Sequence, residues 1–283
     1  MTSERALPYL LLAPSLLFLA LLFLWPLGEA FLVAFSEPGG GWSLANFREM
    51  ADDLNFADAL TNTLLLVVVV VPLQLALALG LGVLLGCIGR GRDTFLYIWT
   101  IPLGISDLAA GIVWLAMLSE RGYLNSLLEA LGLVDGPVLW LSYETPVALF
   151  VAVVVAEVWR ATAIVLVILV AGMQLVPKEY YEAAEVFGAG AFQRFRRITL
   201  PLLKPSIQTA LILRTILAFE VFAVVVVLGG RDLPVLAGEA FAWQYDYRNP
   251  GVASAYAVLI LSVSLAATWL YLRLLRVREE GLA

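Results

Sequence analysis

Long apolar runs, separated by short polar segments, form the main pattern along this chain. Six of them exceed the roughly 18 residues that a helix needs to cross a membrane, and they lie at about 8–35, 60–88, 94–118, 146–172, 205–228 and 252–275. The pattern predicts an all-α polytopic membrane protein with six transmembrane helices.

The first run has a second interpretation, because it follows the short basic segment "MTSERA" as the core of a signal sequence does. Its apolar stretch is longer than the roughly 7–15 residues of such a core, and no convincing small-residue cleavage site follows it. We therefore expect residues 8–35 to remain as the first transmembrane helix.

The distribution of arginine and lysine predicts which loops face the cytoplasm. With the N-terminus inside, eleven of the 17 basic residues fall in inner segments and four in outer segments, and Arg160 and Arg214 lie within spans. This bias follows the positive-inside rule. We expect both termini to lie in the cytoplasm.

The predicted loops differ in kind. Three outer segments are acidic and rich in Gly, Pro and Trp: "SEPGGGWSLANFREMADDLNFADA", "SERGYLNSLLEALGLVDGPVLWLSYET" and "GGRDLPVLAGEAFAWQYDYRNPG". The first inner loop, "GRGRD", is minimal, whereas the second, 173–204, is long and charged. No repeat, linker or soluble domain is visible, so we expect residues 1–283 to form a single transmembrane domain.

Composition supports a membrane protein and excludes several kinds of chemistry. Hydrophobic residues make up 62% of the chain and charged residues 14%, against roughly 45–50% and about 25% in soluble domains. Histidine is absent and Cys87 is the only cysteine, which removes His-dependent triads, His-containing zinc sites and disulfides. We expect no metal site, and the net charge of −6 argues against nucleic acid as a partner.

The chain also lacks the means to bind ATP. No segment matches the phosphate-binding pattern G-x-x-x-x-G-K-[ST]. The glycine-rich "GLGVLLG" lies inside an apolar run, where Gly82 and Gly86 have the spacing of a close helix-packing face. Any energy that this chain takes from ATP must therefore come through another polypeptide.

The second inner loop is predicted to hold two short helices joined by a glycine turn. Pro177 sets a turn before a helix at 178–187, and Gly188 and Gly190 end that helix because glycine adopts positive φ freely. A second helical stretch, "AFQRFRRITL", follows. The pattern leaves two roles open: a basic amphipathic segment on the inner leaflet, or a segment that docks a partner protein.

One motif in this loop is specific. Glu182-Ala183-Ala184, Gly188 and Ile198-x-Leu200-Pro201 stand at the spacing EAA-x3-G-x9-I-x-L-P. This resembles the EAA loop of binding-protein-dependent ABC importer permeases. The resemblance implies a type I ABC importer permease fold, in which the loop forms a coupling helix in a groove of the ATPase. It assigns this coupling to Glu182, Ala183, Ala184, Val186, Phe187, Gly188, Ile198, Leu200 and Pro201.

The resemblance extends over nearly the whole chain and is to maltose- and trehalose-type sugar permeases. It includes "LANF", "ALTNTLLL", "VVAEVWRATAIVLVILVAGMQLVPKEYYEAA" and "LRTILAFEVFAVVVVLGG". Two parts depart from the family. Sugar permeases commonly have Asp immediately before the loop glycine, where this chain has Phe187, and the outer segment "GGRDLPVLAGEAFAWQYDY" differs.

The resemblance also implies partners and a location. We expect a second permease subunit, two cytoplasmic ATPase subunits that bind ATP and Mg, and an extracytoplasmic solute-binding protein that delivers a di- or oligosaccharide. The complex would lie in a bacterial or archaeal cytoplasmic (inner) membrane, in contact with membrane lipid. This chain would bind no cofactor, hold no catalytic residue and be no enzyme.

Ionisable residues inside the spans are costly to bury and mark a pathway or an ion pair. Glu157 and Arg160 are i, i+3 neighbours on one helical face. Arg214 and Glu220 are six residues apart, so each requires a partner from another helix. We predict ion pairs among Glu157, Arg160, Arg214 and Glu220, and two roles stay open, a structural cluster or the wall of a substrate cavity.

Sugar hydroxyls need hydrogen-bonding partners, and the apolar faces of sugar rings suit aromatic side chains. Gln74 and Ser106 add hydrogen-bonding groups within the spans. The candidate cavity residues are Asn62, Asp107, Glu157, Trp159, Arg160, Phe219 and Glu220.

Three alternatives are weighed against a sugar importer. A phosphorylated solute such as glycerol phosphate would demand more arginine than the spans hold, and the acidic outer loops would repel it. An ion-coupled secondary transporter, with Asp107 or Glu157 as its coupling carboxylate, would have no ATPase for the EAA loop to dock. A membrane-embedded enzyme would need a clustered nucleophile and base, and the chain has no histidine.

Overall fold

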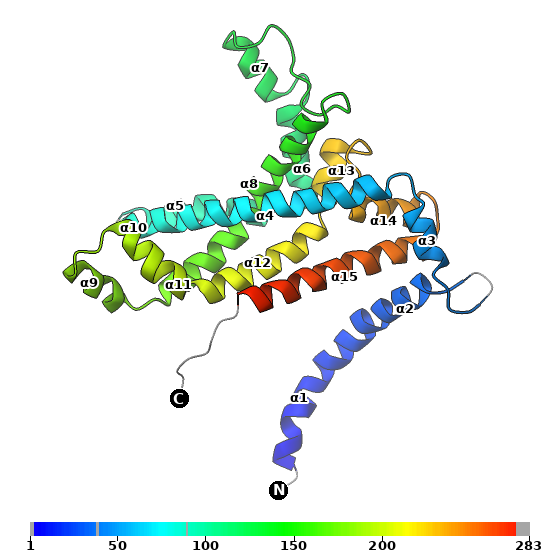
Figure 1. The fold of residues 1–283 in the computed structure, drawn as a ribbon, viewed down its shortest axis with the longest axis horizontal. Coiled ribbons are helices and arrows are strands. Elements are labelled where there is room, and N and C mark those ends of the chain that lie inside the picture. Colours follow the sequence, from blue (N-terminus) through cyan, green and yellow to red (C-terminus); the bar gives the residue numbers. More distant parts are fainter. Residues whose placement is uncertain (1–2, 38–39, 89, 276–283) are drawn as a thin grey trace. The chain divides into compact units, whose positions relative to one another are not determined.

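The protein is described by a computed structural model that covers residues 3–37, 40–88 and 90–275. Most of these residues are helical, and β structure within them is limited to one isolated bridge between Ser36 and Trp42. The predicted all-α class is confirmed (Figure 1).

The helices follow one another in the order α1 (Ser3–Leu19), η1 (Ala20–Leu24), α2 (Trp25–Ala34), α3 (Ala45–Ala51), α4 (Phe56–Cys87), α5 (Arg92–Thr100), η2 (Ile101–Gly104), α6 (Asp107–Leu118), α7 (Tyr123–Ala130), α8 (Pro146–Gln174), α9 (Lys178–Val186), α10 (Ala191–Arg194), η3 (Phe195–Thr199), α11 (Leu200–Leu202), α12 (Lys204–Phe219), α13 (Ala223–Gly229), α14 (Leu236–Tyr245) and α15 (Pro250–Leu274). The elements η1 and η3 are π-helical and η2 is a 3-10 helix.

The structure accommodates the six predicted spans. Four helical stretches are long and apolar enough to cross a membrane: Tyr9–Ala34, Phe56–Gly86, Pro146–Gln174 and Pro250–Leu274. Two bent pairs also reach that length, Arg92–Gly104 with Asp107–Ala130 at 101° and Ala191–Leu202 with Lys204–Phe219 at 66°. The spans number six if each bent pair is one crossing.

The third predicted span, 94–118, is not one helix. α5 gives way to η2, which contains Pro102 and Gly104, and α6 begins only after Ser106. The Ser106 hydroxyl caps α6 by accepting a hydrogen bond from the backbone N–H of Ala109 at 3.2 Å. The prediction of a continuous helix was wrong because hydropathy does not register Pro and Gly, which break helices within apolar runs.

The fifth predicted span, 205–228, is also divided. α12 ends at Phe219, and α13 begins at Ala223. In the turn between them Glu220 is exposed and Val221 is buried in an apolar cluster. The turn lets α13 pack against α6 and α8 instead of continuing along α12. The continuous helix was wrongly predicted because this tertiary packing decides the break and no Pro or Gly marks it.

Contacts gather the chain into two compact units. The first unit comprises Met1–Ala57 and Ala237–Leu261, and the second unit comprises Asp58–Leu236 and Ser262–Ala283. That residues 1–283 form one membrane domain stays a prediction.

Two polar side chains hold the first unit together. The Asn46 amide group of α3 donates hydrogen bonds to the carbonyl oxygens of Val33, Ala34 and Ser36, at 3.0 to 3.1 Å. The Asp53 carboxylate accepts hydrogen bonds from Trp243 Nε1 of α14 at 2.7 Å and from the Tyr256 hydroxyl of α15 at 2.9 Å. These bonds connect the ends of four helices.

The second unit is built on α4, α8 and α12. One apolar cluster joins α4 and α8 with α13 and includes Val70, Val153 and Val225. The other joins α4, α8 and α12 and includes Leu81 and Leu166. Between the two clusters, each of these three helices contributes polar side chains instead of apolar ones.

Candidate functional site

Buried polar side chains from three helices meet between the two apolar clusters. Arg214 of α12 donates through Nη2 to Glu157 Oε2 of α8 at 2.8 Å, and through Nε to Gln74 Oε1 of α4 at 2.6 Å. Gln74 Nε2 in turn donates to the Glu157 carbonyl oxygen at 2.9 Å. No more than 1% of any of the three residues is exposed. Because an unpaired buried charge is costly, each charge here is held by a partner.

Arg160 extends this network toward a less buried region. Its Nη2 lies 3.3 Å from Glu157 Oε2, and its Nη1 lies 2.7 Å from Asp107 Oδ1 at the start of α6. The side chains of Arg160 and Asp107 are 18% and 51% exposed. We call Asp107, Glu157, Arg160 and Arg214 the charge cluster. Its two carboxylates balance its two guanidinium groups.

Two tryptophans and three unused donors lie in the same part of the second unit. The rings of Trp114 and Trp159 are in edge-to-face contact, with centroids 6.1 Å apart at 74°. Trp114 Nε1, Arg160 Nε and Arg214 Nη1 are buried and donate no hydrogen bond to any of the described residues. Such donors can bind water or an acceptor group of a ligand.

Three of the predicted cavity residues form no side-chain hydrogen bond or ion pair with the charge cluster in the described part of the chain. Glu220 is exposed at the turn after α12 and forms no ion pair within the described part of the chain. Phe219 is 3% exposed. Asn62 Nδ2 donates to the Pro234 carbonyl oxygen at 3.0 Å. The ion pairs predicted among Glu157, Arg160 and Arg214 are present, but Asp107 supplies the second carboxylate where we expected Glu220.

Trp114 is a site residue that the sequence analysis missed. It follows Asp107 by seven residues on α6, and positions i and i+7 lie on the same face of a helix. A search for side chains on the Asp107 face would have found it, whereas the apolar character of the run favoured core packing.

The inner loop has the predicted form of a helix followed by a glycine turn. The helix predicted at 178–187 is confirmed as α9, with Phe187 at its C-cap. Gly188 has φ +73°, in the left-handed region that glycine adopts without strain. Gly190 has φ −67° and ψ 166°, an ordinary extended conformation before α10. The positive φ predicted for Gly190 was therefore wrong, because one left-handed residue suffices to reverse the chain.

The end of α9 presents apolar side chains to the surroundings. Val186 is 85% and Phe187 89% exposed. The loop itself is fastened by a hydrogen bond of 3.0 Å between the hydroxyl groups of Tyr181 and Thr199, and by an ion pair between Arg194 and Glu185. The remaining motif residues are Glu182, Ala183 and Ala184 on α9, Ile198 on η3, and Leu200 and Pro201 on α11.

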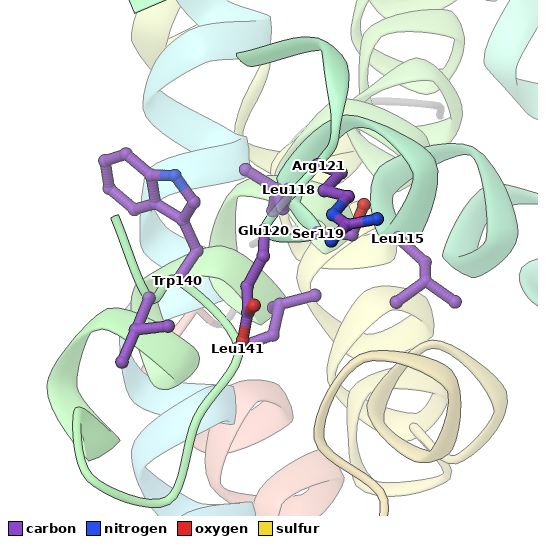
Figure 2. Close-up of a pocket in the computed structure, with 8 residues that line it drawn as sticks. Leu115, Leu118, Ser119, Glu120, Arg121, Trp140 and Leu141 are labelled. Carbon is purple, nitrogen blue, oxygen red and sulfur yellow. The ribbon is translucent and has the colours of Figure 1, made fainter. Parts of the chain in front are cut away.

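A second candidate site lies at the far end of α6. A pocket of about 520 Å³ is lined by Leu115, Leu118, Ser119, Glu120, Arg121, Leu139, Trp140 and Leu141. Figure 2 shows Trp140 on one side of it and Leu115 on the other, with Glu120 and Leu141 between them. The pocket thus combines an aromatic ring, two charges and an apolar wall.

The amide of Asn125 on α7 fixes the backbone around this pocket. Asn125 Nδ2 donates to the carbonyl oxygens of Ser119, Glu120 and Val138 at 3.0 to 3.3 Å. Asn125 Oδ1 accepts from Val138 N at 3.2 Å and from Trp140 Nε1 at 3.0 Å. One buried side chain therefore joins the end of α6 to the segment that carries Trp140.

Asn125→Ala is expected to loosen this segment. It strands buried backbone groups, and we expect it to cost about 1–3 kcal/mol, visible as faster proteolysis around residue 140 and a lower melting temperature of the purified protein. Asn62→Ala, which removes a single hydrogen bond, is the matched control. Equal proteolysis of the two variants would contradict the role given to Asn125.

Helices of membrane-spanning length that bring charges and hydrogen-bonding groups together inside the spans define an integral membrane protein with a polar site between its helices. Among the described residues, no group of three acidic or cysteine side chains is placed to hold a metal ion. The chain belongs to the family described as the binding-protein-dependent transport system inner membrane component, whose model matches residues 5–277. The resemblance drawn from the EAA loop is thereby confirmed.

Two relatives and one solved structure illustrate the membership. The chain is 32% identical over 292 residues to a probable ABC transporter permease protein of Brucella suis biovar 1, covering 98% of this chain and 99% of that one. It is 37% identical over 195 residues to the trehalose/maltose transport system permease protein MalF of Thermococcus litoralis, covering 68% and 65%. Its fold matches a chain of a bacterial ABC transporter involved in the import of the acidic polysaccharide alginate, with a TM-score of 0.83, 22% identity and 98% of both chains covered.

Proposed function

We propose that this chain is one of two permease subunits of an ATP-driven importer for a neutral di- or oligosaccharide. In this proposal an extracytoplasmic binding protein delivers the sugar to the outer segments, and two cytoplasmic ATPase subunits bind ATP and Mg. The complex lies in a bacterial or archaeal cytoplasmic membrane with both termini inside, as the arginine and lysine bias favours.

The exposed apolar end of α9 supports docking of another subunit. Large apolar side chains that find no partner within their own chain are typical of protein contact sites. Val186 and Phe187 stand at the point where Gly188 reverses the chain, so they project together from the loop. We propose that they enter a groove of the ATPase, and that closure of the ATPase pair moves α9 and, through it, the spans.

We propose that the two breaks inside the spans act as hinges when α9 and the spans move. A hinge is a short segment that takes up backbone rotation while the helices on each side stay rigid. The turns at 101–106 and 220–222 flank α6 and α13, which pack against each other. α6 carries Asp107 of the charge cluster, so its movement would alter the substrate path.

The neutral charge cluster is the observation that carries the substrate class. An anionic solute needs an excess of guanidinium or ammonium groups, whereas here Asp107 and Glu157 balance Arg160 and Arg214. A neutral hydroxylated ligand needs hydrogen bonds and ring faces, which the unused donors and Trp159 supply. The Thermococcus relative is named for trehalose and maltose, which agree with this class.

The second candidate is a phosphorylated solute. A relative from Brucella suis biovar 1 that is 30% identical over 280 residues is named for sn-glycerol-3-phosphate. In a complex of two permeases the partner subunit can supply positive charge to the pathway. The two candidates therefore differ in a measurable property of the delivered ligand.

Calorimetry of the cognate binding protein distinguishes them. We expect tight binding of at least one saccharide from a panel of disaccharides and short oligosaccharides, and no binding of sn-glycerol-3-phosphate or of a polyamine. Tight binding of either control without any saccharide would overturn the substrate class. Transport into vesicles that continues without ATP would instead overturn the ATP-driven mechanism and favour an ion-coupled carrier.

A further inference from the structure

An open apolar groove lies where α4 faces the second half of the inner loop. Its volume is about 680 Å³, and it is lined by Ala76, Leu79, Gly80, Val83, Leu84, Ala191, Phe192 and Phe195. The α4 residues belong to a predicted span, whereas Phe192 and Phe195 belong to α10 and η3. The groove therefore lies at the end of a span, beside a helix of the inner loop.

No side chain of the described chain fills this groove. Phe192 is 73%, Leu84 55% and Val83 37% exposed. A side chain added at Gly80 would meet no atom within 4 Å. The volume falls within the range of small-molecule sites, roughly 300–1,000 Å³, so the groove can hold a flexible apolar chain.

Positive charge stands next to the apolar lining. Arg194 precedes Phe195, and Arg196 and Arg197 follow it, along α10 and η3. Arg196 follows Phe192 by four residues, so it lies on about the same helical face, one turn further on. Arg194 is paired with Glu185, whereas Arg196 and Arg197 are exposed and form no ion pair within the described residues.

We propose that this groove binds one anionic phospholipid, with an acyl chain along α4 and the phosphate near Arg196. The apolar lining excludes a polar ligand, and exposed arginines at the end of a span suit the anionic lipids that juxtamembrane basic segments attract. The inference rests on the proposed inward orientation of the loop and not on the transported substrate. The bound lipid would hold α10 and η3 against α4, and so position the loop whose other half is α9.

Gly80→Leu is the sharpest test, because Gly80 lines the groove and an added Cβ there meets no atom within 4 Å. Gly86→Leu is the matched control: it lies on the same helix, an added Cβ there also meets nothing within 4 Å, and Gly86 does not line the groove. The full complex is reconstituted into nanodiscs of phosphatidylcholine with phosphatidylglycerol, and lipids retained by this chain are identified by native mass spectrometry.

We expect wild type and Gly86→Leu to retain a phosphatidylglycerol that Gly80→Leu loses. Arg196→Gln is expected to retain phosphatidylcholine and phosphatidylglycerol alike. Equal retention of phosphatidylglycerol by all four proteins, or equal retention of both lipids by wild type, would overturn the proposal. Loss of a partner subunit from Gly80→Leu with unchanged lipid retention would also overturn it, since protein would then cover the groove.

Discussion

Arg214→Ala is expected to destabilise the protein more than any other single change in the spans. Removal of the guanidinium group leaves Glu157 with only the 3.3 Å contact to Arg160 and leaves Gln74 Oε1 without its donor. Breaking a buried ion pair by removing one partner costs about 3–5 kcal/mol. The measurement is the melting temperature of the purified complex in detergent, together with the yield of assembled complex.

The control is another arginine that lies outside the cluster. Arg273 is exposed and lies over the Trp269 ring, 5.1 Å from its centroid, a contact worth about 0.5–1 kcal/mol. If Arg214→Ala and Arg273→Ala melt alike, the buried pair does not stabilise the fold.

A double variant shows whether Arg214→Ala destabilises the protein by leaving the charge of Glu157 unbalanced or by removing the volume of the arginine side chain. Arg214→Met keeps much of the side-chain length, and combining it with Glu157→Gln removes both members of the pair. Because a buried pair replaced by neutral groups of similar size is often neutral for stability, we expect the double variant to melt above Arg214→Ala. If its transport is lost while its melting temperature recovers, the cluster belongs to the substrate path. If transport also recovers, the cluster is structural.

Phe187→Ala is expected to uncouple ATP hydrolysis from transport while the membrane part stays folded. The ring is 89% exposed in this chain, so its removal costs no internal packing. If the ring is buried in a partner groove, as an anchoring side chain of an interface is, its loss costs about 2 kcal/mol or more, roughly thirtyfold in affinity. Co-purification of the ATPase and sugar-stimulated ATP hydrolysis in liposomes measure the effect.

Gly188→Asp is expected to act in the same direction and more strongly. At φ +73° most residues other than glycine are strained by about 1–2 kcal/mol, and Asp less than most; the main effect is the negative charge placed beside the apolar end of α9. An added Cβ meets no atom within 4 Å, so the fold is spared. Leu54→Ala is the control, since Leu54 is 96% exposed and outside the loop. Wild-type transport and normal ATPase content in Gly188→Asp would contradict the coupling role.

Local sequence determined the helical class, the positions of most spans and the form of α9. Apolar length alone identifies α4, α8 and α15 as spans. A helix suits such an apolar segment because its backbone N–H and C=O groups hydrogen-bond to one another within the helix. Gly188 could be predicted to end α9 in the left-handed conformation, because few residues other than glycine adopt that conformation after a helix. The break at Pro102 and Gly104 could also have been predicted from the sequence, because both residues disfavour a continuous helix. A prediction from hydropathy alone does not take them into account.

The break after Phe219 and the membership of the charge cluster were decided by tertiary structure. The sequence correctly indicated that Arg214 needs a partner from another helix and included Glu157 among the candidates, but it did not identify Gln74 as the second partner, nor Asp107 in place of Glu220. Partner choice across helices depends on the depth and rotation of each helix. Those are fixed by how the two apolar clusters of the second unit pack, which is a property of all the contacting side chains together and of no single segment.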